Sequence, residues 1–236
     1  QVRILTRVVI DQALAGILAI IVLALAALGV VTGSVLAFGG VGWATGLIGL
    51  VYLWGAWLLH VTRQARVLPV PVESPTRPPA RLAPSVARFG VATSILAGAA
   101  WFLIGSAEQL VGSLGVTKGF FGLAVLAIVT SLPEIVVSLA GIRAGSYDLV
   151  VGNLLGSNAF NMVILLLLDL ADGGGPLLAL AEPGVLVGNL FAIILTGLVV
   201  LGTLSQAEPR SRLLDPGAIP VVIGYGLGLA LSSRFT

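Results

Sequence analysis

Seven apolar stretches, each of about 20 residues, constrain the fold of this chain more than any other feature. An α-helix rises about 1.5 Å per residue, so a run of this length crosses the roughly 30 Å hydrocarbon core of a bilayer. The sequence therefore predicts an all-α fold, a polytopic membrane helix bundle with about seven transmembrane helices. The expected spans are approximately 9–31, 41–61, 89–107, 119–145, 149–170, 184–204 and 215–233.

The composition agrees with lipid as the main solvent. Hydrophobic residues make up 58% of the 236 residues. Charged residues make up 9%, against roughly 25% in soluble domains. A water-soluble globule of this size could not cover its surface with so few charges, which excludes a soluble enzyme and a nucleic-acid-binding protein. The chain has no cysteine, which also excludes disulfides and thiolate metal sites.

Basic residues predict the orientation in the membrane. A segment rich in Pro and Arg, residues 62–88, separates the second span from the third and is expected to be a polar linker. If this linker is cytoplasmic, ten arginines lie inside, and Lys118 and Arg234 alone lie outside. We therefore expect an integral protein of the cell (inner) membrane, with the N-terminus and the linker cytoplasmic and the C-terminus outside. The ten inside residues are Arg3, Arg7, Arg63, Arg66, Arg77, Arg81, Arg88, Arg143, Arg210 and Arg212.

One expected span contains an acidic residue deep in the membrane. Glu134 lies about 15 residues after Gly119, or roughly 22 Å along a helix. A carboxylate at that depth costs at least about 2.5–3.5 kcal/mol, so we expect it to face protein or a water-filled cavity and not lipid. Pro133 cannot donate a hydrogen bond to the carbonyl of Val129, so the helix should bend here and leave main-chain oxygens free. Such irregular backbone is tolerated where protein or a water-filled cavity surrounds it.

The next span carries polar residues on one face. Asn153, Ser157 and Asn161 are spaced four apart, and Asn158 lies beside them. Together with Glu134, these side chains provide hard oxygen donors, which suit Ca²⁺ or Na⁺ better than zinc or copper. Alternatively, the amides and hydroxyls only join helices through hydrogen bonds.

Two motifs in these spans resemble a known family. The segments Thr-Ser-Leu-Pro-Glu at 130–134 and Gly-Asn-Leu-Leu-Gly-Ser-Asn-Ala-Phe-Asn at 152–161 are similar to the α-repeat of the calcium/cation antiporter superfamily, which includes the sodium/calcium exchangers. The resemblance implies a fold of ten helices, built as two inverted five-helix halves with broken helices at a central ion site. Each half contributes one α-repeat to that site.

The resemblance also implies how the chain is divided. Residues 1–61 would be the last two helices of the first half, and 62–88 the cytoplasmic linker. Residues 89–236 would be the complete second half, with its α-repeat at about 119–170. No first α-repeat is visible in this chain. We therefore expect a missing first half, supplied by an upstream segment or by a second chain.

The family resemblance implies a membrane antiporter that exchanges Ca²⁺ against Na⁺ or H⁺ by alternating access around a midplane site. Glu134 would be the central carboxylate ligand, and hydroxyl, amide and carbonyl oxygens would complete the cage. No cofactor is expected besides the transported ions. The expected partners are the lipid bilayer, inorganic cations and the missing first half with the other α-repeat, and no nucleic acid is expected. The expected metal-binding residues are Glu134, Thr130, Ser131, Ala127, Ser157, Asn161, Asn153 and Asn158.

One departure from the motif leaves an alternative open. Val129 stands where the family pattern has glycine, so the backbone at the break could be altered. The alternative is a non-transporting or partner-dependent membrane subunit that keeps the exchanger fold. An intramembrane enzyme is disfavoured, because the spans contain one deep carboxylate and no deep histidine to form a catalytic pair.

Overall fold

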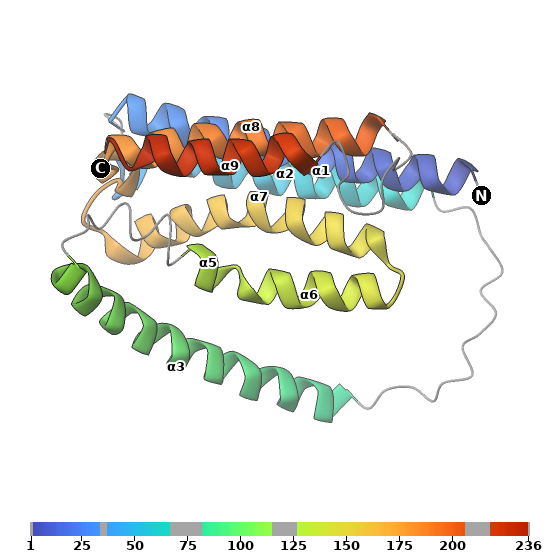
Figure 1. Ribbon diagram of the computed structural model, residues 1–236, viewed down its shortest axis with the longest axis horizontal. Helices are drawn as coiled ribbons and strands as arrows, with labels where there is room; N and C mark the ends of the chain where they lie inside the picture. The colour runs from blue at the N-terminus through green and yellow to red at the C-terminus, as the bar shows by residue number, and fades with distance from the viewer. Residues whose placement is uncertain (1, 34–36, 67–81, 115–126, 206–217, 236) are drawn as a thin grey trace.

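The structure is a computed structural model that describes residues 2–33, 37–66, 82–114, 127–205 and 218–235 of the chain (Figure 1). Most of these residues form long helices that run alternately up and down one axis. Their bounds are α1 (Val2–Val31), α2 (Trp43–Arg66), α3 (Leu82–Leu114), α5 (Ala127–Thr130), α6 (Leu132–Arg143), α7 (Tyr147–Asp172), α8 (Pro183–Ser205) and α9 (Ala218–Ser232). Strands β1 (Ala37–Phe38) and β2 (Val41–Gly42) and the 3₁₀ helix η2 (Leu177–Leu180) complete the described elements.

Five helices within the described residues are long and apolar enough to cross a membrane. They are α1, α2, α3, α7 and α8, which match five of the expected spans. The two remaining expected spans are shorter here: α9 has 15 residues, and the stretch expected at 119–145 is divided into α5 and α6. Residues 119–126 and 215–217 of those spans lie outside the described part. The prediction of an all-α integral membrane protein is confirmed.

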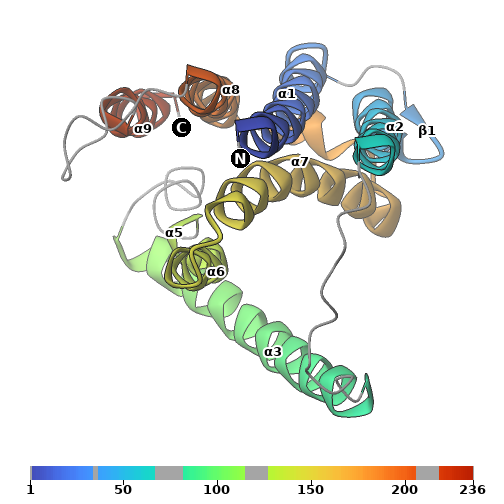
Figure 2. The ribbon, with the colours of Figure 1, turned by 90° about the vertical axis from the view of Figure 1, so that its right-hand side faces the viewer.

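The core forms around α1, which packs against α2, α7 and α8. Figure 2 views these helices nearly end-on and shows α1 between α8 and α2, with α7 below. Small residues allow the close approach. A Cβ added at Gly16 would lie 2.2 Å from Val200 Cγ2, and one at Gly55 would lie 2.5 Å from Leu18 Cδ1. The interior is therefore built from tight helix contacts, as in other membrane bundles.

The helix ends fall into two groups. The start of α1, the end of α2, the start of α3 and the ends of α6 and α8 lie at one end of the molecule, on the right in Figure 1. Each of the helix ends from α1, α2, α3 and α6 in this group contains at least one of the arginines expected on the same side of the membrane. The helices also extend into both ends of the range expected for the linker, because α2 continues to Arg66 and α3 begins at Leu82. Residues 67–81 are outside the described part, and the division into domains stays a prediction.

A small β-hairpin precedes α2 at the opposite end. Phe38 pairs with Val41 in the antiparallel register, with Gly39 and Gly40 as the two turn residues. Their φ values of 60° and 87° lie in the left-handed region that glycine favours, and a Gly-Gly pair suits such a two-residue turn. Residues 41 and 42 belong to the second expected span, whereas in the structure they form β2 and the helix begins at Trp43.

The buried Asp169 of α7 holds this hairpin in place. Its Oδ2 accepts hydrogen bonds from the backbone N–H of Gly42 at 3.0 Å and from the hydroxyl of Thr45. Its Oδ1 accepts one from the N–H of Leu177 at 2.8 Å. The carboxylate thus connects α7, η2 and the start of α2.

Candidate ion-binding site

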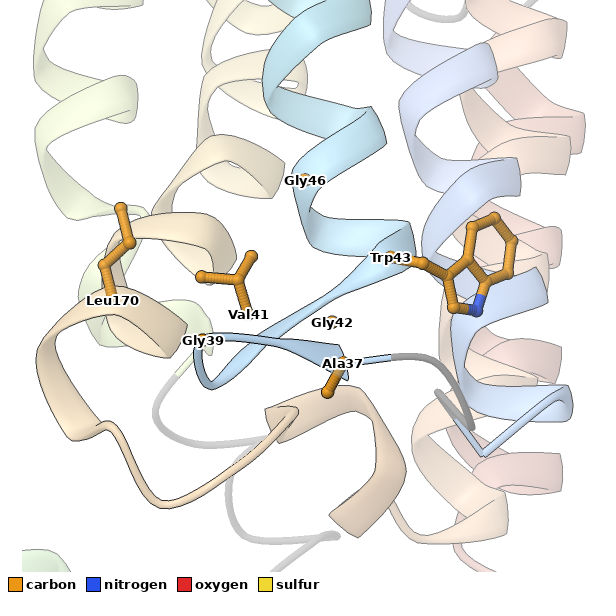
Figure 3. Close-up of a pocket in the computed structure, with 7 residues that line it drawn as sticks. All are labelled: Ala37, Gly39, Val41, Gly42, Trp43, Gly46 and Leu170. Carbon is orange, nitrogen blue, oxygen red and sulfur yellow. The ribbon is translucent and has the colours of Figure 1, made fainter.

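A cavity beside the β-hairpin carries no charged group. It has a volume of about 640 Å³ (Figure 3). Val41 and Leu170 project into the same region, whereas the indole of Trp43 points away from them. Without carboxylates or amides in its lining, this cavity does not suit a cation. Its lining residues are Ala37, Gly39, Val41, Gly42, Trp43, Gly46 and Leu170.

A second cavity, of about 300 Å³, lies between α6 and α7 and gathers most of the expected site residues. Two adjacent helices contribute to it, which is what the face analysis of the two spans predicted. Five of the eight expected metal ligands line it: Ser131, Glu134, Ser157, Asn158 and Asn161.

The helix break that the sequence predicted occurs at Ser131. This residue has φ −88° and ψ 0° and separates α5 from α6. Its N–H donates to the carbonyl of Ala127 at 3.0 Å, and its carbonyl accepts from the N–H of Ile135 at 3.1 Å. Pro133 lies in the first turn of α6, where a missing N–H is tolerated. The chain therefore stays hydrogen-bonded around the break while α5 runs at an angle to α6 (Figure 1).

A tight turn brings α7 back against α6. Gly145 has φ +69°, and the N–H of Ser146 donates to the carbonyl of Gly141 at 2.9 Å. Gly141 is buried at the contact, where an added Cβ would lie 2.8 Å from Val150 Cγ2. The glycine thus lets the two helices approach closely, so Glu134 and the polar face of α7 share one cavity.

Glu134 is the residue of this cavity with a buried carboxylate oxygen that lacks a hydrogen-bond partner. Its side chain is half-buried, and its Oε2 is buried without a hydrogen-bond partner. The described residues that line the cavity include no lysine or arginine. A buried carboxylate oxygen without a partner is costly, and a bound cation would offset that cost.

The hydroxyl of Ser157 faces the same cavity and retains an acceptor oxygen. It donates its proton to the carbonyl of Leu154 at 3.1 Å, which leaves lone pairs on Oγ for a cation. Asn158 and Asn161 add side-chain amides from the same helix. The arrangement therefore offers carboxylate, hydroxyl and amide oxygens from α6 and α7.

Three expected ligands do not line this cavity. Thr130 is exposed, and its hydroxyl donates to the carbonyl of Ala127 at 3.2 Å. That carbonyl also accepts the bond from Ser131, and Ala127 itself lines a different cavity against α8 and α9. Asn153 lies one turn before Ser157 on α7, and its Nδ2 is buried without a hydrogen-bond partner. The break turns α5 away from the face that Glu134 occupies.

One polar residue of the cavity is not among the expected ligands. Ser138 lines it one turn after Glu134. The spacing of four residues placed Ser138 on the same helix face, so that signal was present in the sequence. The other lining residues are the apolar Ile135, Leu139, Ile142 and Leu154.

The chain matches the model of one known protein family. The model of the family described as sodium/calcium exchanger protein matches residues 84–234, well over half of the chain. The chain belongs to the sodium/calcium exchanger family. The matched range includes the helix break, the α6–α7 hairpin and the Glu134 cavity. The resemblance in the two motifs is thereby confirmed.

Two curated relatives match part of this exchanger-family chain. It is 38% identical over 78 residues to inner membrane protein YrbG of Escherichia coli (strain K12), and 38% identical over 73 residues to "Putative antiporter CaxA" of Alkalimonas amylolytica. These matches cover 33% and 31% of the chain, and span about a quarter of the relatives' lengths, 24% and 23%. No solved structure matches the chain.

Proposed function

We propose that this chain belongs to a membrane cation antiporter that exchanges Ca²⁺ against Na⁺ or H⁺. The observation that carries the proposal is the buried, unpartnered Oε2 of Glu134 beside a helix break, opposite the polar face of α7. Family membership supports cation transport, and one relative has the word antiporter in its name. Hard oxygen donors without nitrogen or sulfur ligands favour Ca²⁺ and Na⁺.

In this proposal, Glu134 is the central ligand. The Ser131, Ser157, Asn158 and Asn161 side chains contribute oxygens around it. Antiport follows because the two ions compete for the same oxygens, while the helices around the site move to expose it alternately to either side. Thr130, Ala127 and Asn153 would enter the ligand set in another state of the cycle, after the hydrogen bonds at the break rearrange.

We further propose that a second α-repeat completes the site. Glu134 is the carboxylate among the described lining residues, and a Ca²⁺ site is better balanced by two acidic side chains. An upstream segment or a second chain would supply the other acid within an inverted-repeat fold. The division into 1–61, 62–88 and 89–236 belongs to this proposal.

The proposed orientation places the N-terminus and the linker in the cytoplasm and the C-terminus outside the inner membrane. Its support is the positive charge of the sequence together with the helix ends that carry arginine: the start of α1, the end of α2, the start of α3 and the end of α6 lie at one end of the molecule. Cysteines introduced one at a time beside Arg143 and at Glu182 should react from opposite sides of the membrane with an impermeant thiol reagent. The native chain contains no cysteine that would interfere.

Transport is tested with the chain and its natural upstream reading frame, reconstituted into proteoliposomes. Uptake of ⁴⁵Ca²⁺ should follow an imposed Na⁺ or H⁺ gradient and stop when an ionophore collapses that gradient. The gradient that drives uptake identifies the counter-ion. If neither gradient moves Ca²⁺, Na⁺ or another cation, the antiporter proposal is wrong.

Val129 favours a second candidate function, a non-transporting or partner-dependent membrane subunit. This β-branched residue lies in α5, two residues before the break, where the family motif has glycine, and its branched side chain would restrict rearrangement of the backbone. For such a subunit, the proteoliposomes would show no flux, whereas the protein would still insert and co-purify with a membrane partner. Recovery of flux in Val129→Gly would show that this position had suppressed transport.

A further inference from the structure

Ser232, near the end of α9, has a buried hydroxyl without a hydrogen-bond partner. Its side chain is 1% exposed, and its Oγ finds no partner. Other helix hydroxyls donate to a carbonyl one turn earlier, as Thr196 does to Ala192 at 2.7 Å and Thr203 does to Val199 at 2.8 Å. A buried hydroxyl without a hydrogen-bond partner is unfavourable, so a bound molecule that forms a hydrogen bond with Ser232 would be stabilising.

Ser232 lines a cavity of about 170 Å³ between α8 and α9. The cavity reaches Ala127, the first residue of α5. Gly228 lets the helices approach here, because an added Cβ would lie 2.9 Å from Phe191 Cγ. The lining is apolar apart from Ser232 and Tyr225 and consists of Ala127, Gly188, Phe191, Ala192, Leu195, Tyr225, Gly228, Leu229 and Ser232.

The size and lining of this cavity define the chemistry that it would accept. An apolar cavity of about 150 Å³ in another protein stays free of water and binds benzene. A water molecule needs two to four polar partners, and this cavity offers few. A cation is equally disfavoured, because no acidic residue is among the described lining residues.

We propose that this cavity binds a small, neutral, membrane-soluble alcohol. The apolar body of the ligand packs against Phe191 and Leu195, and its hydroxyl forms a hydrogen bond with Ser232 Oγ. The end of a lipid acyl chain could fill the volume but would leave the Ser232 hydroxyl unsatisfied. The surrounding bilayer concentrates molecules of this class, so the ligand can enter from the lipid.

The experiment compares two probes that differ mainly in the hydroxyl group. The chain is reconstituted into phosphatidylcholine nanodiscs, and 4-fluorobenzyl alcohol or 4-fluorotoluene is titrated while ¹⁹F NMR line broadening is recorded. Empty nanodiscs measure partitioning into lipid, so the saturable excess reports binding to the protein. We expect the alcohol to bind more tightly than the toluene.

Two variants and a matched control locate the binding. Ser232→Ala should weaken alcohol binding about three- to tenfold, the range expected for one hydrogen bond, and leave toluene binding unchanged. Ser233→Ala removes an exposed hydroxyl that donates to the carbonyl of Ala230 and should change neither. Ala192→Leu fills the cavity and should remove the saturable binding of both probes.

Three results would overturn the proposal. They are the absence of saturable alcohol binding, equal binding of the two probes to the native chain, and unchanged alcohol binding in Ser232→Ala. If Ser232→Ala does not fold, as judged by its thermal unfolding, the probe comparison in the native chain and the loss of binding in Ala192→Leu decide the question.

Discussion

The hydroxyl of Thr45 in α2 and the carboxylate of Asp169 in α7 are joined by a 2.5 Å hydrogen bond, although they lie 124 positions apart in the chain. Both side chains are completely buried. Asp169 also accepts two backbone N–H groups, from Gly42 and Leu177. The start of α2 is therefore fixed to α7 by a polar contact as well as by packing.

Asp169→Asn should destabilise the protein by about 2–3 kcal/mol. An amide offers one acceptor oxygen in place of two, and its NH₂ group would face a backbone N–H that also needs an acceptor. Thermal unfolding in detergent measures the effect. Asp172→Asn, three residues later and exposed, is the control and should leave the melting temperature unchanged. Equal stability of both variants would show that the Asp169 contacts contribute little.

Glu134→Gln should abolish Ca²⁺-dependent flux in the complete transporter. The substitution keeps the shape of the side chain but removes the charge that we propose to bind the cation. Membrane insertion and the melting temperature should be preserved, because Oε2 makes no hydrogen bond that the variant would lose. Glu182→Gln, at an exposed position, is the control and should transport normally. Flux at the native level in Glu134→Gln would remove Glu134 from the mechanism.

Pro133→Ala should straighten the break and slow transport. The introduced N–H can donate to the carbonyl of Val129, which the proline leaves without this bond. Hydrogen exchange at position 133 would report the new bond as a slowly exchanging amide. Flux measured on the same preparation tests whether the break matters. A protected amide with unchanged flux would separate the helix break from ion movement.

Gly141→Val should push α6 and α7 apart. The added Cβ would lie 2.8 Å from Val150 Cγ2, and overpacking of this kind costs about 1–3 kcal/mol. The second substitution Val150→Ala should restore much of the lost stability, because it removes the clashing methyl groups. Gly202→Ala, where an added Cβ meets no atom within 4 Å, serves as the control. A melting temperature that Gly141→Val does not lower would contradict the close contact.

The sequence predicted the parts of the fold that depend on local pattern. Long apolar runs located α1, α2, α3, α7 and α8, and Pro133 predicted the break beside Glu134. The spacing of polar residues also placed Ser157 and Asn161 on the helix face that borders the Glu134 cavity.

Other features depend on contacts between distant segments. Asp169 has polar partners before α2, in α2 and at the start of η2, which no periodicity in its own helix could reveal. Ala127 and Thr130 share helical spacing with Glu134, but the change of direction at Ser131 takes α5 away from the cavity. Spacing predicts a common face along a continuous helix and loses that power across a break.

The close contact between Gly141 and Val150 favours movement of the α6–α7 hairpin as one rigid body. With a short turn and no bulky side chain between the helices at that point, neither helix can slide far without carrying the other along. Glu134 and the polar residues of α7 would then move together and keep their relative positions. Access to the site would then open and close through movement of the other helices relative to this hairpin.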